Sequence, residues 1–226
     1  MIFITGDLHG YYDFDKLPAF AAEHTDLTRD DFVIVAGDFG IWSLTDIRYG
    51  LERHKSLPFT ILFVDGNHEH FDALDSLSVE SWHGGKVHRL AENVLHLMRG
   101  QIFEIEGKTF FTFGGATSND KERRVEGEDW FPQEVPSDAD MVEANRNLAR
   151  VGYKVDYLVT HTCDERALYY PVIRDARIFR IHPENAMLSY FEERVDYGHW
   201  YFAHFHVDGE VTGKKTVLYE RILRVL

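Results

Sequence analysis

The chain has 226 residues, with 24 Lys and Arg against 38 Asp and Glu, so its formal net charge is −14. Hydrophobic residues make up 44% and charged residues 27%, which is typical of a globular protein and excludes wholesale disorder. The negative charge repels a phosphate backbone and argues against long nucleic acid as a partner. One cysteine, Cys163, excludes an internal disulfide, and no apolar run reaches the ~18 residues of a membrane span. We therefore expect a cytoplasmic protein that folds as a single domain over residues 1–226.

Three short apolar runs in the first third of the chain predict strands that are buried on both faces. These runs are Met1–Thr5, Phe32–Ala36 and Thr60–Val64. The segments between them, near Phe14–His24 and Leu44–Ser56, have the length of crossover helices. Each run is followed by polar residues. Because open α/β sheets bind ligands beyond the carboxyl ends of their strands, a site is expected at these ends.

The middle of the chain changes from this pattern to a hairpin. Ile102–Ile105 and Thr109–Phe113 flank a Glu-Gly-Lys turn and predict two antiparallel strands. The polar stretch Asn119–Gln133 is long for a plain connection, so we expect either a functional loop or local disorder. Ser137, with Asp140 three residues later, resembles a capping box and predicts the start of a helix.

The last third returns to strands that are followed by polar residues. Asp156–Val159 leads to His161, and Trp200–Ala203 leads to His204. Between them, Pro183 predicts the first turn of a helix. Two more runs predict a closing hairpin, Val207–Val211 and Thr216–Tyr219.

Metal-ligating residue types gather at five of the predicted strand ends. The candidates are Asp7, His9, Asp38, Asn67, His161, His204 and His206. Carboxylate, imidazole and amide oxygen suit divalent Mn, Fe, Co or Zn, and the chain has no paired thiols for a softer site. Any one of these motifs alone is more often a turn or a helix cap. Together they exceed the needs of one tetrahedral ion and fit two ions, the arrangement that supports in-line displacement at phosphorus.

The order of these motifs resembles that of the calcineurin-like metallophosphoesterases. The motifs are GDLHG (Gly6–Gly10), GDFG (Gly37–Gly40), GNHE (Gly66–Glu69), His161 and AHFH (Ala203–His206). The resemblance spans nearly the whole chain. It implies an α/β fold, a four-layer αββα sandwich with a dinuclear metal site at the carboxyl ends of the strands.

The resemblance also implies a role for each candidate. The first ion would be held by Asp7, His9, Asp38 and His206. The second ion would be held by Asp38, Asn67, His161 and His204. Asp38 would thus bridge the two ions, while His68 would be no ligand and would assist the leaving group. The nucleophile would be a metal-bridging hydroxide. Manganese is the first candidate for both ions, with iron, zinc, cobalt and nickel as alternatives.

Two positions depart from the Ser/Thr-phosphatase branch of this family. Ile41 stands where that branch has the Asp that orients its catalytic His, and Phe71 stands where it has an Arg. The resemblance therefore does not extend to a protein phosphatase. It also leaves open which residue orients His68.

Further contacts to a phosphate group are expected from basic residues close to the motifs. His70 follows GNHE directly, and Arg123 and Arg124 lie on the polar stretch. Arginine suits bidentate recognition of phosphate. The alternative interpretations are a surface histidine and a solvated charged loop.

We therefore expect a dinuclear metal-dependent phosphoesterase that hydrolyses a small phosphomonoester or phosphodiester. One alternative is a metal-dependent nuclease, which the acidic composition disfavours. Another is a metal-binding scaffold that serves only protein contacts, which the complete ligand set disfavours. The sequence does not indicate an oligomeric state.

Overall fold

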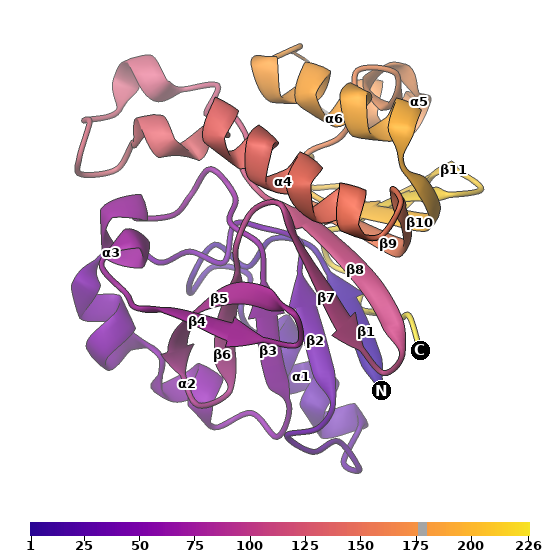
Figure 1. Cartoon of the computed structure of the whole chain (residues 1–226). Coiled ribbons are helices and arrows are strands. Elements are labelled where there is room, and N and C mark those ends of the chain that lie inside the picture. The colour runs from indigo at the N-terminus through magenta and orange to yellow at the C-terminus, as the bar shows by residue number, and fades with distance from the viewer. Residues whose placement is uncertain (176–179) are drawn as a thin grey trace.

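The computed structural model describes residues 1–175 and 180–226 and has a mixed α/β fold, as predicted. Its strands form two sheets, one of seven strands and one of six. Helices α4, α5 and α6 gather on one side of the molecule, while α1, α2 and α3 lie on the opposite side (Figure 1). The two chain ends lie close together, because β1 pairs with β13 near the C-terminus.

The seven-stranded sheet has the order β13-β1-β2-β3-β6-β5-β4. Its strands are β1 (Ile2–Thr5), β2 (Phe32–Val35), β3 (Thr60–Phe63), β4 (Val79–Trp82), β5 (Gly85–Ala91), β6 (Val94–Leu97) and β13 (Leu223–Arg224). The three runs predicted as parallel strands are β1, β2 and β3, and they pair in parallel, which confirms the prediction. Strands β4 and β5 add an antiparallel edge that the sequence interpretation did not include.

The six-stranded sheet has the order β11-β12-β10-β9-β8-β7. Its strands are β7 (Gln101–Ile105), β8 (Lys108–Phe113), β9 (Lys154–Thr160), β10 (Asp196–Phe202), β11 (Gly209–Thr212) and β12 (Lys215–Val217). Both predicted hairpins are confirmed, since β7 pairs antiparallel with β8 and β11 pairs antiparallel with β12. Strands β8, β9 and β10 are parallel to one another.

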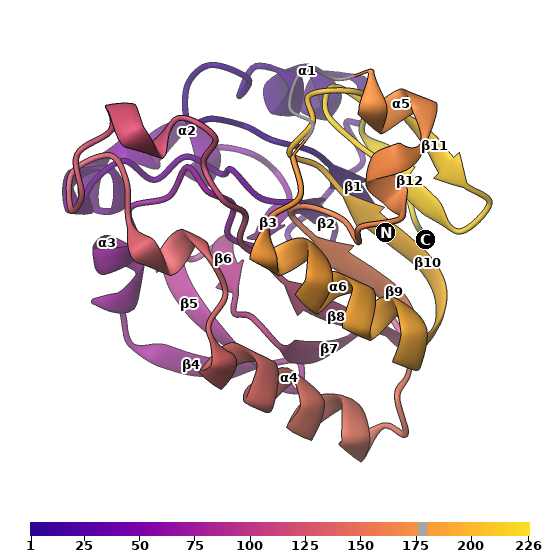
Figure 2. The same ribbon diagram turned by 90° about the horizontal axis from the view of Figure 1, so that it is seen from above.

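Helices cover the outer face of each sheet, and a third core lies between the sheets. The α-helices are α1 (Lys16–Glu23), α2 (Glu52–Lys55), α3 (Phe71–Asp75), α4 (Asp138–Arg150), α5 (Pro171–Arg174) and α6 (Pro183–Arg194). Leu17 of α1 and Phe63 of β3 belong to one buried hydrophobic cluster, and Leu188 of α6 and Trp200 of β10 belong to a second. Ile34 of β2 and Phe110 of β8 share the core between the sheets. The layers therefore run helix, sheet, sheet, helix (Figure 2).

The expected helix near Leu44–Ser56 is split in two. A π-helical turn spans Asp46–Gly50, and α2 begins only at Glu52. Gly50 lies at the break, and glycine in a helix interior costs roughly 1 kcal/mol relative to alanine. The segment therefore consists of a π-helical turn that ends at Gly50 and the short helix α2, with Leu51 between them.

The polar stretch 119–133 is irregular, with short 3₁₀ turns at Lys121–Arg123 and Pro132–Glu134. It stands beside α3 in both views (Figures 1 and 2). Phe131 packs against His70, and Gln133 Nε2 donates to Asp72 Oδ1 at 3.1 Å. Of the two expectations for this stretch, the structure shows a loop with defined contacts.

Candidate metal centre

The carboxyl ends of β1, β2, β3, β9 and β10 converge, and Asp38 lies at the centre of the side chains that follow them. Its Oδ2 atom is 3.2 Å from His9 Nε2, and its Oδ1 atom is 3.4 Å from His161 Nε2. The two oxygens of one carboxylate thus face two different histidines. This is the arrangement that a carboxylate shared between two ions requires.

Asp7 lies at the side of the cluster that carries His9 and His206. Its Oδ2 atom is 3.3 Å from His206 Nε2, and the ring centres of His9 and His206 are 4.9 Å apart. The Asp7 side chain is fully buried, whereas 43% of the His206 side chain is exposed. The cluster therefore opens to solvent beside His206.

Asn67, His161 and His204 form the other side of the cluster. His161 Nε2 is 3.2 Å from Asn67 Oδ1 and 3.3 Å from His204 Nδ1. All three residues are buried. The structure thus brings together all seven residues that the sequence analysis proposed as ligands.

Outer residues fix which nitrogen of each histidine faces the cluster. His161 Nδ1 donates to the carbonyl of Ala36 at 2.8 Å, and His9 Nδ1 lies 2.7 Å from Asp13 Oδ2. These bonds leave Nε2 of both rings directed at Asp38. Ligating histidines in metal sites typically use one ring nitrogen for the metal and the other for such an acceptor.

The backbone at the site is held in unfavourable conformations. His9, Asp38, His204 and His206 have φ angles of 44°, 49°, 73° and 51°. Non-glycine residues in this left-handed region cost of order 1–3 kcal/mol each and cluster at functional sites. Four of the non-glycine residues with positive φ therefore gather in the candidate site, while His83, Glu106 and Tyr153 lie outside it.

Two motif glycines are explained by close approach to the candidate ligands. A Cβ atom on Gly37 would lie 2.1 Å from His161 Nδ1, and one on Gly66 would lie 2.0 Å from Asp38 Oδ1. Neither position accommodates a side chain. The glycines before Asp38 and Asn67 therefore serve the packing of the site itself.

Electrostatics at the site favour bound positive charge. Burial lowers the pKa of His161, but the adjacent carboxylates of Asp38 and Asp7 outweigh it and raise the value to about 9. Burial likewise opposes protonation of His9, yet Asp38, Asp7 and Asp13 raise its pKa to about 9. Burial raises the pKa of Asp38, but the neighbouring histidines, His161 foremost, hold it well below its ordinary value. Without a metal ion, the negative charge of these carboxylates thus favours protonated histidines. A bound cation would satisfy the same negative charge.

The donor set fits divalent metal ions. Asp7 Oδ2 is buried and lies 3.3 Å from His206 Nε2, but it accepts no hydrogen bond from the described residues, which is costly for a buried carboxylate oxygen. In each of three groups of residues, the candidate ligand atoms lie within 4.8 Å of one another, and the groups share members. The groups are Asp7-His9-His206, His9-Asp38-His68 and Asp7-Asp38-His161. Nitrogen and carboxylate oxygen in this number suit borderline divalent ions.

His68 lies at the edge of the cluster. Its backbone N–H donates to Asp38 Oδ1 at 2.8 Å, and its Nδ1 atom is 3.2 Å from a guanidinium nitrogen of Arg124. Burial lowers the pKa of His68. The charge of Asp38 raises it and that of Arg124 lowers it, and the pKa stays below its ordinary value. The contact with Arg124 occupies Nδ1 and leaves Nε2 available to a substrate.

The three predicted substrate contacts are placed differently from one another. Arg124 reaches the site through His68, while Arg123 is exposed at the end of a 3₁₀ turn. His70 is the N-cap of α3, where its Nδ1 accepts from the backbone N–H of Ala73 at 3.2 Å. The structure thus gives His70 a local role in starting a helix.

Sequence analysis missed two buried carboxylates that hold the motif loops. Glu69 accepts hydrogen bonds from the backbone N–H groups of Phe39, Gly40 and Ile41. It therefore ties the GNHE loop to the GDFG loop, and burial raises its pKa to about 8. Its place inside a motif was the available signal.

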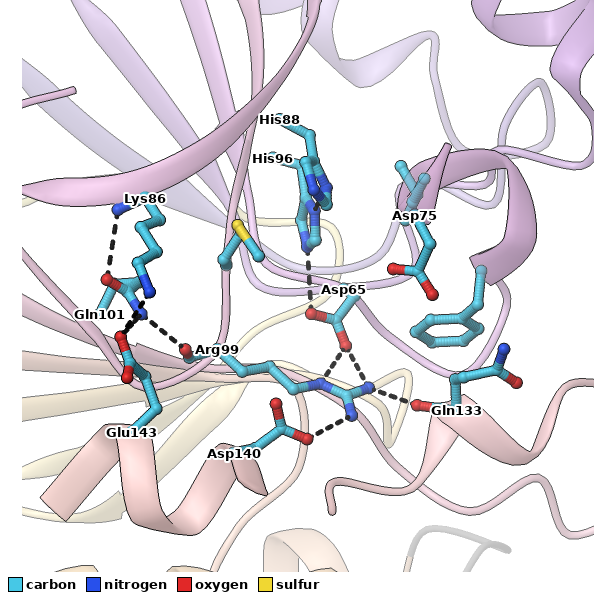
Figure 3. Close-up of a pocket in the computed structure, with 13 residues that line it drawn as sticks. Asp65, Asp75, Lys86, His88, His96, Arg99, Gln101, Gln133, Asp140 and Glu143 are labelled. Atoms are coloured by element: carbon cyan, nitrogen blue, oxygen red, sulfur yellow. Dashed lines mark hydrogen bonds and ion pairs between the residues drawn. The ribbon is translucent and has the colours of Figure 1, made fainter. Parts of the chain in front are cut away.

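The second of these carboxylates is Asp65, which directly precedes Gly66. Its Oδ1 faces His96 Nε2 at 3.1 Å and its Oδ2 accepts from Arg99 Nε at 2.7 Å (Figure 3). Its backbone carbonyl accepts from Gly115 N at 2.8 Å. The pocket drawn in Figure 3 is lined by Asp65 but by none of the seven candidate ligands. The contacts of Asp65 therefore hold the loop that carries Asn67 without taking part in the cluster itself.

Comparison with known proteins places the chain in a family. The model for calcineurin-like phosphoesterases matches residues 1–208, so the chain belongs to the calcineurin-like phosphoesterase family. It is therefore a metal-dependent phosphoester hydrolase.

Comparisons with solved structures and with curated proteins do not refine this family assignment. Among solved structures, the phosphopantetheinyl hydrolase (PptH) from Mycobacterium tuberculosis resembles the chain with 17% sequence identity, 96% of this chain and 87% of that chain covered, and a TM-score of 0.42. No curated protein matches the chain.

Within residues 1–175 and 180–226, no helix has both the length and the apolar character needed to span a bilayer.

Proposed function

We propose that the protein is a dinuclear metal-dependent phosphoesterase that hydrolyses a small phosphomonoester or phosphodiester. The observation that carries the proposal is the position of Asp38, whose two oxygens face His9 and His161 at 3.2 and 3.4 Å. Asp7, His9, Asp38 and His206 would hold one ion. Asp38, Asn67, His161 and His204 would hold the other. Manganese is the first metal to test.

The ions, when bound, would polarise the phosphoryl oxygens and supply an attacking water that is acidic enough to ionise near neutral pH. The chain itself provides the remaining functions. Asp13 and the Ala36 carbonyl hold the ligand histidines in place. His68, whose Nδ1 atom contacts Arg124, would assist the departing oxygen by donating a hydrogen bond from Nε2.

Charge at the site supports a small substrate. The chain as a whole carries −14, which opposes a long polyanion, whereas two dications would offset the buried carboxylates locally. The nuclease alternative is therefore disfavoured. We further propose that residues 1–226 form one metallophosphoesterase domain that works in the cytoplasm.

The test combines metal content with turnover. Purified protein is loaded with Mn²⁺, and elemental analysis is expected to give two ions per chain, with anomalous density on both sides of Asp38. Hydrolysis of an aryl phosphomonoester and a bis-aryl phosphodiester then identifies the preferred ester, and a single-stranded oligonucleotide tests the nuclease alternative. Two bound ions with no turnover of any ester would favour the scaffold alternative, and no ions would refute the proposal.

A further inference from the structure

The polar segment from Ser118 to Glu134 contacts both residues at the centre of the GNHE motif. Ser118 bonds to Asn67, and Arg124 bonds to His68. We propose that this segment sets which atom of each side chain faces the metal centre, so that Ser118, Glu134 and Arg124 are positioning residues. The proposal rests on the proposed function, since it assigns these residues to that same site.

The first contact is a directed chain of hydrogen bonds. Asn67 Nδ2 lies 3.2 Å from Ser118 Oγ, and Ser118 Oγ lies 2.7 Å from Glu134 Oε2. Glu134 Oε1 also accepts from the backbone N–H of Ser118 at 2.7 Å. All three side chains are buried, so water does not compete for these bonds.

The direction of this chain follows from the proton count. A serine hydroxyl has one proton, and a carboxylate has none to donate. Ser118 therefore donates to Glu134 and must accept from Asn67, which forces the amide NH₂ of Asn67 toward Ser118. The Oδ1 atom of Asn67 is thereby turned toward His161 Nε2, 3.2 Å away, in the orientation that a ligand needs.

The second contact fixes a histidine tautomer. A guanidinium group only donates hydrogen bonds, so His68 Nδ1 must accept from Arg124 NH1 and carry no proton. The proton of the neutral ring is then on Nε2. That is the nitrogen left to face a substrate, which answers how His68 is oriented in a chain that has Ile41 in the GDFG loop.

Arg124 is itself held in place by the segment. Its Nε and NH2 atoms donate to the two oxygens of Asp120 at 2.8 and 3.0 Å, and NH1 also donates to the carbonyl of Asp129 at 3.1 Å. Only 16% of its side chain is exposed. These bonds engage all three guanidinium nitrogens, so the geometry favours a role through His68 over direct binding of phosphate.

The Asn67 contact is tested by metal affinity. Ser118→Ala removes the acceptor and lets the amide rotate, and Ser118→Thr keeps the hydroxyl. Losing an outer partner of a metal ligand typically costs about 10- to 100-fold in affinity. We expect calorimetric titration with Mn²⁺ to show that loss for one ion in Ser118→Ala, little change for the other ion, and recovery in Ser118→Thr. If Ser118→Ala fails to fold, Glu134→Gln tests the same series of hydrogen bonds from Asn67 through Ser118 to Glu134. Two ions bound with unchanged affinity would overturn the role proposed for Ser118.

The His68 contact is tested by a spectroscopic signature. In Zn²⁺-loaded protein labelled with ¹⁵N-histidine, the His68 signals, assigned with His68→Gln, should show a proton on Nε2. Arg124→Met should give a mixture of tautomers and lower kcat by about 10- to 100-fold with little change in KM. Arg124→Lys, which keeps a donor, should restore both. A rise in KM with the tautomer unchanged would overturn the positioning role and make Arg124 a phosphate ligand.

The controls separate this inference from the proposed function. The wild-type protein must first bind two Mn²⁺ ions and hydrolyse an aryl phosphate, or the proposed function itself fails. Arg146→Gln removes an exposed arginine that pairs with Glu143 on the same helix, α4, and it should leave affinity, tautomer and rates unchanged. Wild-type activity combined with unaltered Ser118 and Arg124 variants would refute the inference alone.

Discussion

At the scale of single residues, the site depends on groups that are individually unremarkable in sequence. Asp38 follows a buried strand in the way that many turn residues do. Its importance lies in its two oxygens, which face histidines from different sheets. Gly37 and Gly66 allow that approach, because a Cβ atom at either position would overlap a candidate ligand.

Asp38→Asn is expected to damage activity more than any other single change of a ligand. The substitution removes a negative charge and the only side chain proposed to bind both ions, so we expect a loss of more than ~100-fold, which exceeds the typical cost of losing a partner of a metal ligand. His206→Ala loosens one exposed ligand of one ion, so excess Mn²⁺ should partly restore its rate. Steady-state rates across a Mn²⁺ titration compare the two variants. Equal rescue of both would contradict the bridging assignment.

His68→Ala is expected to keep both metal ions and to lose rate according to the leaving group. A hydrogen bond donated to the departing oxygen should be worth at most the ~10²–10⁴-fold that is typical of general acid catalysis, so an alkyl phosphate should lose up to about that much and an activated aryl ester less. Asn67→Ala should instead loosen one ion and slow both substrates alike. Metal content, melting temperature and both rates are measured for each variant. Metal loss in His68→Ala would make His68 a ligand, and equal losses on both substrates would argue against assistance to the leaving group.

At the scale of elements, a strand could be predicted from the sequence when both of its faces are buried. β1, β2 and β3 are buried along their whole length, so their continuous apolar runs could be recognised. β4 is an edge strand of alternating exposure, and its mixed composition carries no comparable signal. The segment near Leu44–Ser56 was expected to be a single helix because it has the length of a crossover helix, yet it consists of a π-helical turn that ends at Gly50 and of α2, with Leu51 between them.

The start of α4 is the element boundary that the sequence predicted most directly. Ser137 and Asp140 form a reciprocal capping box, with Ser137 Oγ accepting from the backbone of Asp140. Ser137→Ala should lower the free energy of unfolding by about 1 kcal/mol, because an N–H group of the first turn loses its partner. Chemical denaturation measures the loss, and Ser137→Asp should recover most of it. Catalytic rates should not change, since α4 carries none of the candidate ligands.

At the scale of the whole molecule, the site combines residues from the beginning and the end of the chain, which follow strands of different sheets. Asp7 and His9 come from the first sheet, and His204 and His206 come from the second. Their order along the chain was sufficient to propose a common site, because parallel strands present their carboxyl ends at one edge. The contacts made by Asp65, Ser118 and Arg124 could not be proposed in this way. They depend on how loops pack in three dimensions, and no spacing in the sequence encodes that.

The stability of the whole molecule should depend on pH through a buried histidine outside the site. His54 on α2 packs against Phe14 and Phe39, with ring centres 4.4 and 4.9 Å apart, and neither of its nitrogens has a hydrogen-bond partner within residues 1–175 and 180–226. Burial, aided by the charge of Arg53, lowers its pKa from 6.5 to about 4. The unfolded chain therefore binds a proton more readily than the folded one between these values. Stability is fully present above pH 6.5 and is lost as the pH falls toward 4.

His54→Met removes this linkage while keeping a side chain of similar volume. Between pH 7.5 and pH 5, the wild-type protein should lose about 2 kcal/mol of unfolding free energy through His54, and the variant should not. Urea denaturation of metal-free protein at both pH values gives the four free energies. The difference of differences cancels the effect of methionine packing and of all other titrating groups. Parallel pH profiles for the two proteins would show that His54 is protonated as easily in the folded state as in the unfolded chain, and would contradict the buried, unpaired environment that α2 gives it.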